Sequence, residues 1–331
     1  MTHIIRNSNT LNTALKKYGI VIVLFLMIIF LSIFEPAFLS PTNIFNVLTQ
    51  SAIFGIMALG LTFVIISKGI DLSVGSILAL AGVIAASLAQ VSNATDKYFP
   101  NLVELPVIIP IIAALFIGAA SGAISGFLIA KTKIPAFIAT LGMMTIARGF
   151  ALIYTNGKPI STFIPGMNAL GGRVFDIIPV PVIIYFITIA VSFILLNKTR
   201  FGKNVYAIGG NITAAEVSGV NVSKNLIIIY AYSGLLAGIA AIVFAGRVGS
   251  VHPGAAAGYE LTAIAATTIG GTSHSGGIGT IWGAFVGALV LSVMRNGMTL
   301  LGVDAYWQQI AEGVIIVVAV IIDMRKNARR D

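Results

Sequence analysis

The residues with the greatest potential for chemistry are ionisable side chains inside or beside long apolar runs. We single out four of them: Asp71, Arg148, Glu260 and Glu312. A charged group within a bilayer is costly, so it usually marks an ion or proton pathway or else a paired structural contact. Both a role in transport and a structural role therefore have to be weighed for this set.

A structural role is the simpler interpretation. Asp71 or Ser73 can accept hydrogen bonds from free backbone N–H groups and cap the helix that follows. Arg148 can pair with Glu260 or with Glu312. A proton or sodium relay needs chains of buried acids and histidines, and the histidines fall in predicted loops or tails: His3, His252 and His274. The set is therefore too sparse for such a relay.

Sites for catalysis, metals or nucleotides are not predicted. The glycine-rich segment 269–279 lacks the Gly-x-x-x-x-Gly-Lys-Ser/Thr pattern of a phosphate loop and reads as a tight turn between two spans. The chain has no cysteine, which excludes disulfides and thiolate metal sites. No nucleophile–base arrangement or metal-ligand spacing is evident. We therefore predict that the chain is not an enzyme and binds no cofactor or metal of its own.

The composition is that of a membrane protein. Among its 331 residues, 57% are hydrophobic and 9% are charged, and the mean hydropathy is +1.00. Soluble domains have about 25% charged residues, so most of this surface must face lipid. The net charge of +9 sits in short clusters between apolar runs. That placement is typical of membrane orientation signals and argues against nucleic-acid binding.

Hydropathy predicts an all-α polytopic bundle of about ten spans, forming one permease-like domain over residues 1–331. The predicted spans are 18–34, 44–67, 72–93, 105–130, 135–155, 175–196, 224–246, 258–271, 277–298 and 305–323. About 20 residues are needed to cross a bilayer, so the eighth span is short enough to be re-entrant or broken. The first is read as an uncleaved span, because no small-x-small cleavage site follows it.

The basic residues predict that both termini face the cytoplasm. Most lysines and arginines fall in the segments that ten crossings would place inside, including Lys16–Lys17, Lys198–Lys203 and Arg325–Arg330. Five fall in outer segments: Lys97, Lys158, Arg173, Arg247 and Arg295.

Two spans carry glycine at every fourth residue. One stripe is Gly118, Gly122 and Gly126, and the other is Gly279, Gly283 and Gly287. Glycines on one helical face allow close backbone approach. We expect packing within the chain, and a homodimer seam or a moving gate is the alternative.

A polar, basic segment, residues 197–223, interrupts the apolar chain on the predicted inner side. Cytoplasmic loops of membrane proteins are usually short, so a long one with helix-forming residues at its centre indicates a docking surface for a cytoplasmic partner.

Six segments, in order along the chain, resemble the permease subunits of ribose-type sugar ABC importers, which include ribose, xylose, arabinose and galactose permeases. They are Gly69–Gly75, Pro135–Leu141, Tyr154–Pro159, Tyr206–Asn211, Val217–Asn221 and Tyr259–Ala265. Each segment is a weak signal alone, but together the resemblance extends from about Phe38 to Asp323. The segments resemble the ribose permeases most.

The resemblance implies a permease of the bacterial inner membrane that forms a homodimer. It also implies two kinds of partner: a cytoplasmic ATP-binding subunit that carries ATP and Mg, and a periplasmic binding protein that delivers a monosaccharide. The segment 197–223 would then be the ATPase-coupling loop. The expected coupling residues are Gly210, Asn211, Thr213, Ala214, Ala215, Glu216, Ser218 and Gly219.

Within that loop, the resemblance predicts a short helix from Thr213 to Gly219. Ala214 and Ala215 are small enough for a partner surface to approach closely, and Gly219 can adopt the positive φ that ends a helix. Many ABC permeases carry an acidic residue where this chain has Thr213, so no salt bridge from that position is expected.

A translocation path for sugar needs weak, exchangeable hydrogen bonds. The candidates are Thr49, Gln50, Ser51, Asn296, Gln308 and Gln309, for which bonding between neighbouring helices is an equally good interpretation. An ion-coupled secondary sugar transporter would need a buried ion site and usually internal repeats, neither of which is evident. A passive sugar channel would leave the basic loop unexplained.

Overall fold

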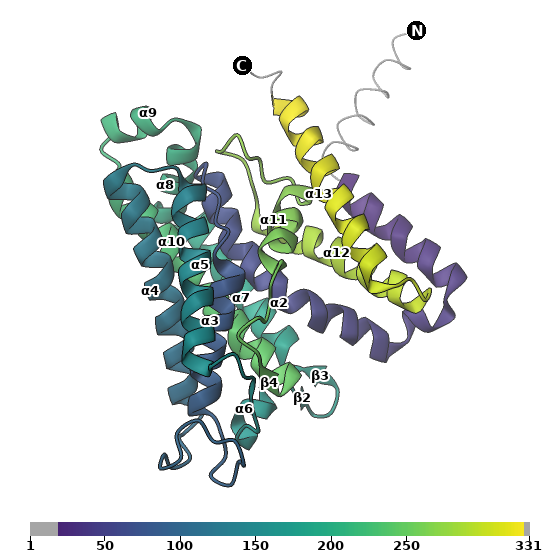
Figure 1. Cartoon of the computed structure of the whole chain (residues 1–331). Helices are drawn as coiled ribbons and strands as arrows, with labels where there is room; N and C mark the ends of the chain where they lie inside the picture. The colour runs from purple at the N-terminus through teal and green to yellow at the C-terminus, as the bar shows by residue number, and fades with distance from the viewer. Residues whose placement is uncertain (1–18, 328–331) are drawn as a thin grey trace.

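The computed structural model describes residues 19–327, which are almost entirely helical (Figure 1). The helices are Gly19–Phe34, η1 (Pro36–Leu39), α2 (Pro41–Ile66), α3 (Val74–Leu88), α4 (Ile108–Thr132), α5 (Ala136–Thr155), α6 (Pro165–Ala169), α7 (Val180–Lys198), α8 (Arg200–Gly210), α9 (Ile212–Val217), α10 (Val222–Val248), α11 (Tyr259–Ile269), α12 (Ile281–Leu300) and α13 (Ala305–Asn327). Four two-residue strands form two antiparallel pairs: β1 (Ile160–Ser161) with β4 (Ser250–Val251), and β2 (Arg173–Val174) with β3 (Ile178–Pro179).

The all-α, polytopic membrane fold is confirmed. Seven described helices are long and apolar enough to span a bilayer: α2, α4, α5, α7, α10, α12 and α13. Gly19–Phe34 and α3 are shorter apolar helices, and α11 has only 11 residues. The count of ten crossings therefore stays a prediction, with α11 as the uncertain crossing.

Helix α2 is the centre of the bundle. In its most apolar 18-residue window, 94% of the residues are buried, against 6% in α13. From Ala52 to Ile66 helix α2 is almost wholly apolar, as expected for a helix segment with neighbours on all sides. Helices α10, α12, α7 and α11 all pack against it. Residues 51–66 of α2 therefore face protein, whereas α13 offers most of its surface to lipid.

Both glycine stripes serve packing within the chain, as expected. Gly118, Gly122 and Gly126 of α4 lie against α10, where a Cβ added at Gly126 would stand 2.8 Å from the Cα of Ile227. In the second stripe, Gly283 and Gly287 of α12 lie against Gly270 and Ala266 at the end of α11, while Gly279 precedes α12 and packs against Ile66 of α2 and Thr272. These positions admit no side chain, so the two backbones approach as closely as small residues allow in membrane helices.

The molecule has two distinct ends (Figure 1). Helices α8 and α9 lie at one of them, which we call the α9 end. Strands β2, β3 and β4 and helix α6 lie at the other, the hairpin end. The C-terminal part of α13 reaches the α9 end. The predicted cytoplasmic location of the two termini themselves lies outside the described residues, which exclude 1–18 and 328–331.

Candidate functional site

The segment predicted to couple to a partner folds as two short helices at the α9 end. Thr199 caps α8 by accepting from the Gly202 N–H at 3.2 Å, and Asn211 caps α9 by accepting from the Ala214 N–H at 3.0 Å. Gly219 follows α9 with φ +83°, the left-handed conformation expected there. The structure thus contains a short helix, Ile212–Val217, within two residues of the predicted bounds.

The exposed face of α9 differs from the expectation in one respect. Ala215 is buried against Ile208 and Val222, so it packs α9 onto the chain's own helices. The expectation that Ala215 admits a partner surface is therefore wrong for this residue, because the one-turn helix needs an inward anchor. The exposed coupling residues are Gly210, Asn211, Thr213, Ala214, Glu216, Ser218 and Gly219. Beside them stands Val217, a large apolar side chain that is 85% exposed.

The end of α8 is joined to the end of α2 by direct backbone contact. A Cβ added at Gly209 would collide with the Ile66 carbonyl and would stand 2.7 Å from the Gly277 nitrogen. The Gly277 N–H in turn donates to the Ile66 carbonyl at 2.8 Å. We call this contact among Ile66, Gly209 and Gly277 the glycine junction.

Side chains around the glycine junction reinforce it. The Tyr206 hydroxyl of α8 donates to the Gly279 carbonyl at 2.7 Å, and the Lys68 ammonium donates to the Gly210 carbonyl at 3.4 Å. The loop between α11 and α12 is also tied to α13, because the His274 N–H donates to the Asp323 carboxylate at 3.0 Å. Movement of α8 and α9 therefore cannot leave the end of α2 or this loop unaffected.

Asp71 stabilises the turn before α3 and cross-links it to another helix, but it does not cap α3, because the N-cap residue is Ser73 and no side chain accepts from the first-turn N–H groups. Its Oδ1 accepts from both the N–H and the hydroxyl of Ser73, at 2.9 and 2.5 Å, just before α3 begins. Its Oδ2 accepts from the Ser233 hydroxyl of α10 at 2.9 Å. The carboxylate is fully buried but satisfied by these bonds. It therefore fixes the turn between α2 and α3 against α10.

Arg148 does not form the expected ion pair. Its guanidinium donates to the carbonyls of Pro253 and Ala255, at 2.7 and 2.8 Å, in the loop before α11. Glu260 is near enough to interact with it electrostatically, while accepting from the Gly258 N–H at 3.2 Å. A pair with Glu312 is excluded because that carboxylate has a different partner. Arg148 thus holds a loop whose carbonyls no helix satisfies.

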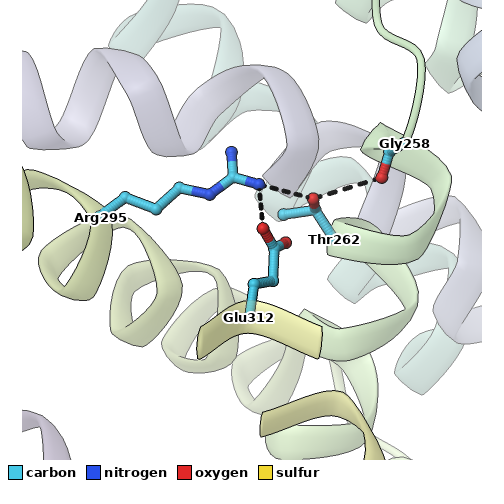
Figure 2. Close-up of polar contacts among 4 residues, drawn as sticks. All are labelled: Gly258, Thr262, Arg295 and Glu312. Carbon is cyan, nitrogen blue, oxygen red and sulfur yellow. Dashed lines mark hydrogen bonds and ion pairs between the residues drawn. The ribbon is translucent and has the colours of Figure 1, made fainter. Parts of the chain in front are cut away.

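The partner of Glu312 is Arg295, which the sequence reading assigned to an outer segment. Figure 2 shows the Arg295 guanidinium, from α12, bonded both to the Glu312 carboxylate of α13 and to the Thr262 hydroxyl of α11. Arg295 is inside a helix and is the one arginine that forms an ion pair within residues 19–327. Arg148 was singled out because it is an ionisable residue inside a predicted span. The same criterion would have singled out Arg295, which falls within the predicted span 277–298.

Most of the uncharged residues predicted to line the translocation path form hydrogen bonds within their own helix or to a neighbouring helix. Asn296 forms a reciprocal amide pair with Asn43 of α2, at 2.8 and 2.9 Å. Ser51 is buried and donates to the Leu48 carbonyl. Gln308 donates to Thr299 and to the Val303 carbonyl, which closes a local turn. Thr49 is half-buried on α2 and Gln309 is exposed on α13, so the set does not form one continuous line.

Gln50 is different because it lines a cavity of about 290 Å³ between α2, α10, α11 and α12. The other polar groups of this cavity are Arg247, Tyr259 and Arg295. We call it the polar cavity. Arg247 belongs to the last turn of α10 and so, like Arg295, is part of a helix. None of these three residues was predicted as a site residue, because helices distant in sequence bring them together.

Comparison with known proteins gives consistent matches over nearly the whole chain. Residues 43–320 match the family model described as branched-chain amino acid transport system / permease component. The ribose import permease protein RbsC of Escherichia coli (strain K12) is 43% identical over 311 residues, which cover 92% of this chain and 93% of the relative. The galactose/methyl galactoside import permease protein MglC of the same strain is 42% identical and covers 98% of both chains.

A relative from another organism agrees with these two. The ribose import permease protein of Bacillus subtilis (strain 168) is 42% identical over 316 residues, 95% of this chain and 94% of the relative. No solved structure matches the chain.

Proposed function

Because the chain belongs to the family of branched-chain amino acid transport system permease components, we propose that it is the membrane-spanning permease subunit of an ATP-driven ABC importer of monosaccharides. One observation carries the proposal. Relatives named for ribose and galactose import share about two residues in five with this chain along almost its full length. The substrate class we propose is therefore a neutral pentose or hexose.

We propose that the membrane path and the ATP site belong to different subunits. The chain supplies apolar helices around a central, buried α2, and a polar helical segment at the α9 end. We propose that ATP and its Mg ion are bound by a separate cytoplasmic subunit. A periplasmic binding protein would deliver the sugar at the hairpin end, and a second copy of the chain would complete the transporter in a bacterial inner membrane.

We propose that α9 and its flanks, residues 210–219, seat in the ATP-binding subunit. Helix α9 is short, capped at its start and anchored inward by Ala215, so it presents a defined surface. Val217 is 85% exposed, and an exposed apolar side chain of this kind suits a pocket on a partner. This surface also leads directly into the glycine junction, which contacts the end of α2.

Import by the reconstituted complex tests the proposed function. Proteoliposomes that contain the chain, its ATP-binding subunit and the loaded binding protein should take up radiolabelled ribose or galactose only when ATP is enclosed on the ATPase side. Uptake of sugar by the chain alone, driven by a sodium or proton gradient, would overturn the proposal.

A matched pair of substitutions tests the docking surface. Val217→Arg should reduce the amount of ATP-binding subunit that co-purifies with the chain by about tenfold or more, the effect of removing a well-packed anchor. The control is Val103→Arg, because Val103 is 73% exposed in the loop before α4, away from the α9 end. Equal co-purification in both variants would remove α9 from the proposed interface.

A further inference from the structure

The polar cavity gathers hydrogen-bonding side chains from four helices. Gln50 comes from α2, Arg247 from α10, Tyr259 from α11 and Arg295 from α12. Polar side chains in a membrane protein usually face one another or a cavity that holds a polar solute. Four helices therefore converge on one small polar space.

The two arginines of the cavity are held in different ways. Arg295 is fixed by Glu312 and Thr262, and its guanidinium lies 5.6 Å from the centre of the Phe54 ring. Arg247 makes no hydrogen bond or ion pair to any residue that the structure describes, and it is exposed. One cation is therefore a fixed part of the wall, while the N–H donors of the other remain free for a solute.

The lining suits a neutral, polyhydroxylated ring. Arginine offers paired N–H donors, and the Gln50 amide both donates and accepts, so together they match adjacent hydroxyl groups. The half-buried Phe244 adds aromatic surface to the wall, which suits the C–H face of a sugar. Ligand pockets run from roughly 300 to 1,000 Å³, and a cavity of about 290 Å³ at the lower limit favours a single ring.

We propose that the polar cavity is a transient binding site for the imported monosaccharide, with Arg247 and Gln50 as the residues that contact its hydroxyl groups. This inference rests on the proposed function of the chain as a sugar permease. Binding is transient because the free donors of Arg247 are on one exposed helix end, which leaves the sugar able to depart. Weak binding of this kind is what conduction through a membrane requires.

The test uses the complete transporter in proteoliposomes, with radiolabelled ribose and then galactose on the binding protein. The quantity measured is the amount of sugar imported per ATP hydrolysed. Gln50→Leu and Arg247→Met should each lower this ratio by about tenfold, the effect of losing one hydrogen bond to the solute. Arg247→Lys keeps the charge but loses the paired donors, so it should also lower the ratio, by several-fold.

Lys131→Met is the matched control, because Lys131 is an exposed cation in the last turn of α4 that neither lines the cavity nor belongs to residues 210–219 or the hairpin end. It should keep the wild-type ratio. The inference is overturned if Gln50→Leu and Arg247→Met keep the wild-type ratio. It is also overturned if Arg247→Lys behaves as wild type, since charge alone would then suffice. Absence of ATP-driven import by the wild-type complex would instead contradict the proposed function.

Discussion

The polar cavity contacts residues 50–54 near the middle of α2, the glycine junction contacts its last residue, and the two are built from opposite kinds of contact. Gln50 of α2 faces the cavity, and the Ile66 carbonyl that closes α2 belongs to the junction. About 24 Å of helix separates them at 1.5 Å per residue. In the cavity, charged and amide side chains meet across open space. In the junction, backbone meets backbone, and an added methyl group has no room.

This difference predicts how each region responds to change. The cavity can accept a side chain of equal size and lose only its hydrogen bonds, so its substitutions should alter sugar handling more than folding. The junction cannot accept an added atom without moving a backbone, so its substitutions should disturb the contact between α8 and α2. Since α2 connects the two, we expect coupling defects from the junction and selectivity defects from the cavity.

The largest effect should come from Gly209→Val. The new side chain would collide with the Ile66 carbonyl and crowd the Gly277 nitrogen, neither of which can rotate away. We expect a loss of more than about 3 kcal/mol of stability from overpacking, seen as a large fall in thermal stability in detergent. Gly210→Ala is the control, because nothing lies within 4 Å of that position. Equal stability in both variants would contradict the close contact.

Next in size is Glu312→Ala, which leaves the Arg295 charge without its partner beside the cavity. Removing one member of a buried pair costs about 3–5 kcal/mol. We expect about 3 kcal/mol here, because the two side chains are 20% and 10% exposed and water screens them in part. The double variant Arg295→Met with Glu312→Leu should recover most of the lost thermal stability. A double variant as unstable as the single one would argue against the pair.

A smaller effect is expected from Asn296→Ala, which breaks the reciprocal amide pair between α2 and α12. The Asn43 oxygen would lose its partner in a buried setting, at a cost of about 1–2 kcal/mol. Asn197→Ala is the comparison, since that exposed amide bonds only to the Phe193 carbonyl of its own helix. If sugar import falls while thermal stability is unchanged, Asn296 belongs to the path, as the sequence first suggested.

The smallest effect is a pH dependence in the loop between α11 and α12. Burial lowers the pKa of His274 below its usual value of 6.5, and the nearby Asp323 carboxylate opposes this shift. The folded state therefore binds protons less readily than the unfolded chain, so stability is complete above pH 6.5 and falls as the pH drops below that value. We expect stability to fall between pH 7 and pH 5.5, and this fall to be absent in His274→Gln. An equal slope in that variant would assign the pH dependence to other groups.

The sequence by itself determined the membrane fold, the approximate positions of the long apolar helices and a short helix within the polar segment 197–223. These features depend on local patterns: run length, glycine spacing and clusters of basic residues. Helix α9 begins at Ile212, one residue before the predicted start. The agreement is close because the Asn211 cap and the positive φ of Gly219 are local features that a sequence shows directly. The family resemblance rested on such short segments, and the comparisons confirmed it.

Only the tertiary structure decided which polar groups meet. Arg295 pairs with Glu312, while Arg148 bonds loop carbonyls, although both arginines had the same potential partner. Ala215 turned out to face inward, and Gln50 alone among the candidate path residues faces the polar cavity. The physical reason is that such contacts depend on the rotation and depth of helices that are distant in sequence. The rotation and depth of each helix are set by the packing of the whole bundle around α2, and a local sequence pattern does not predict them.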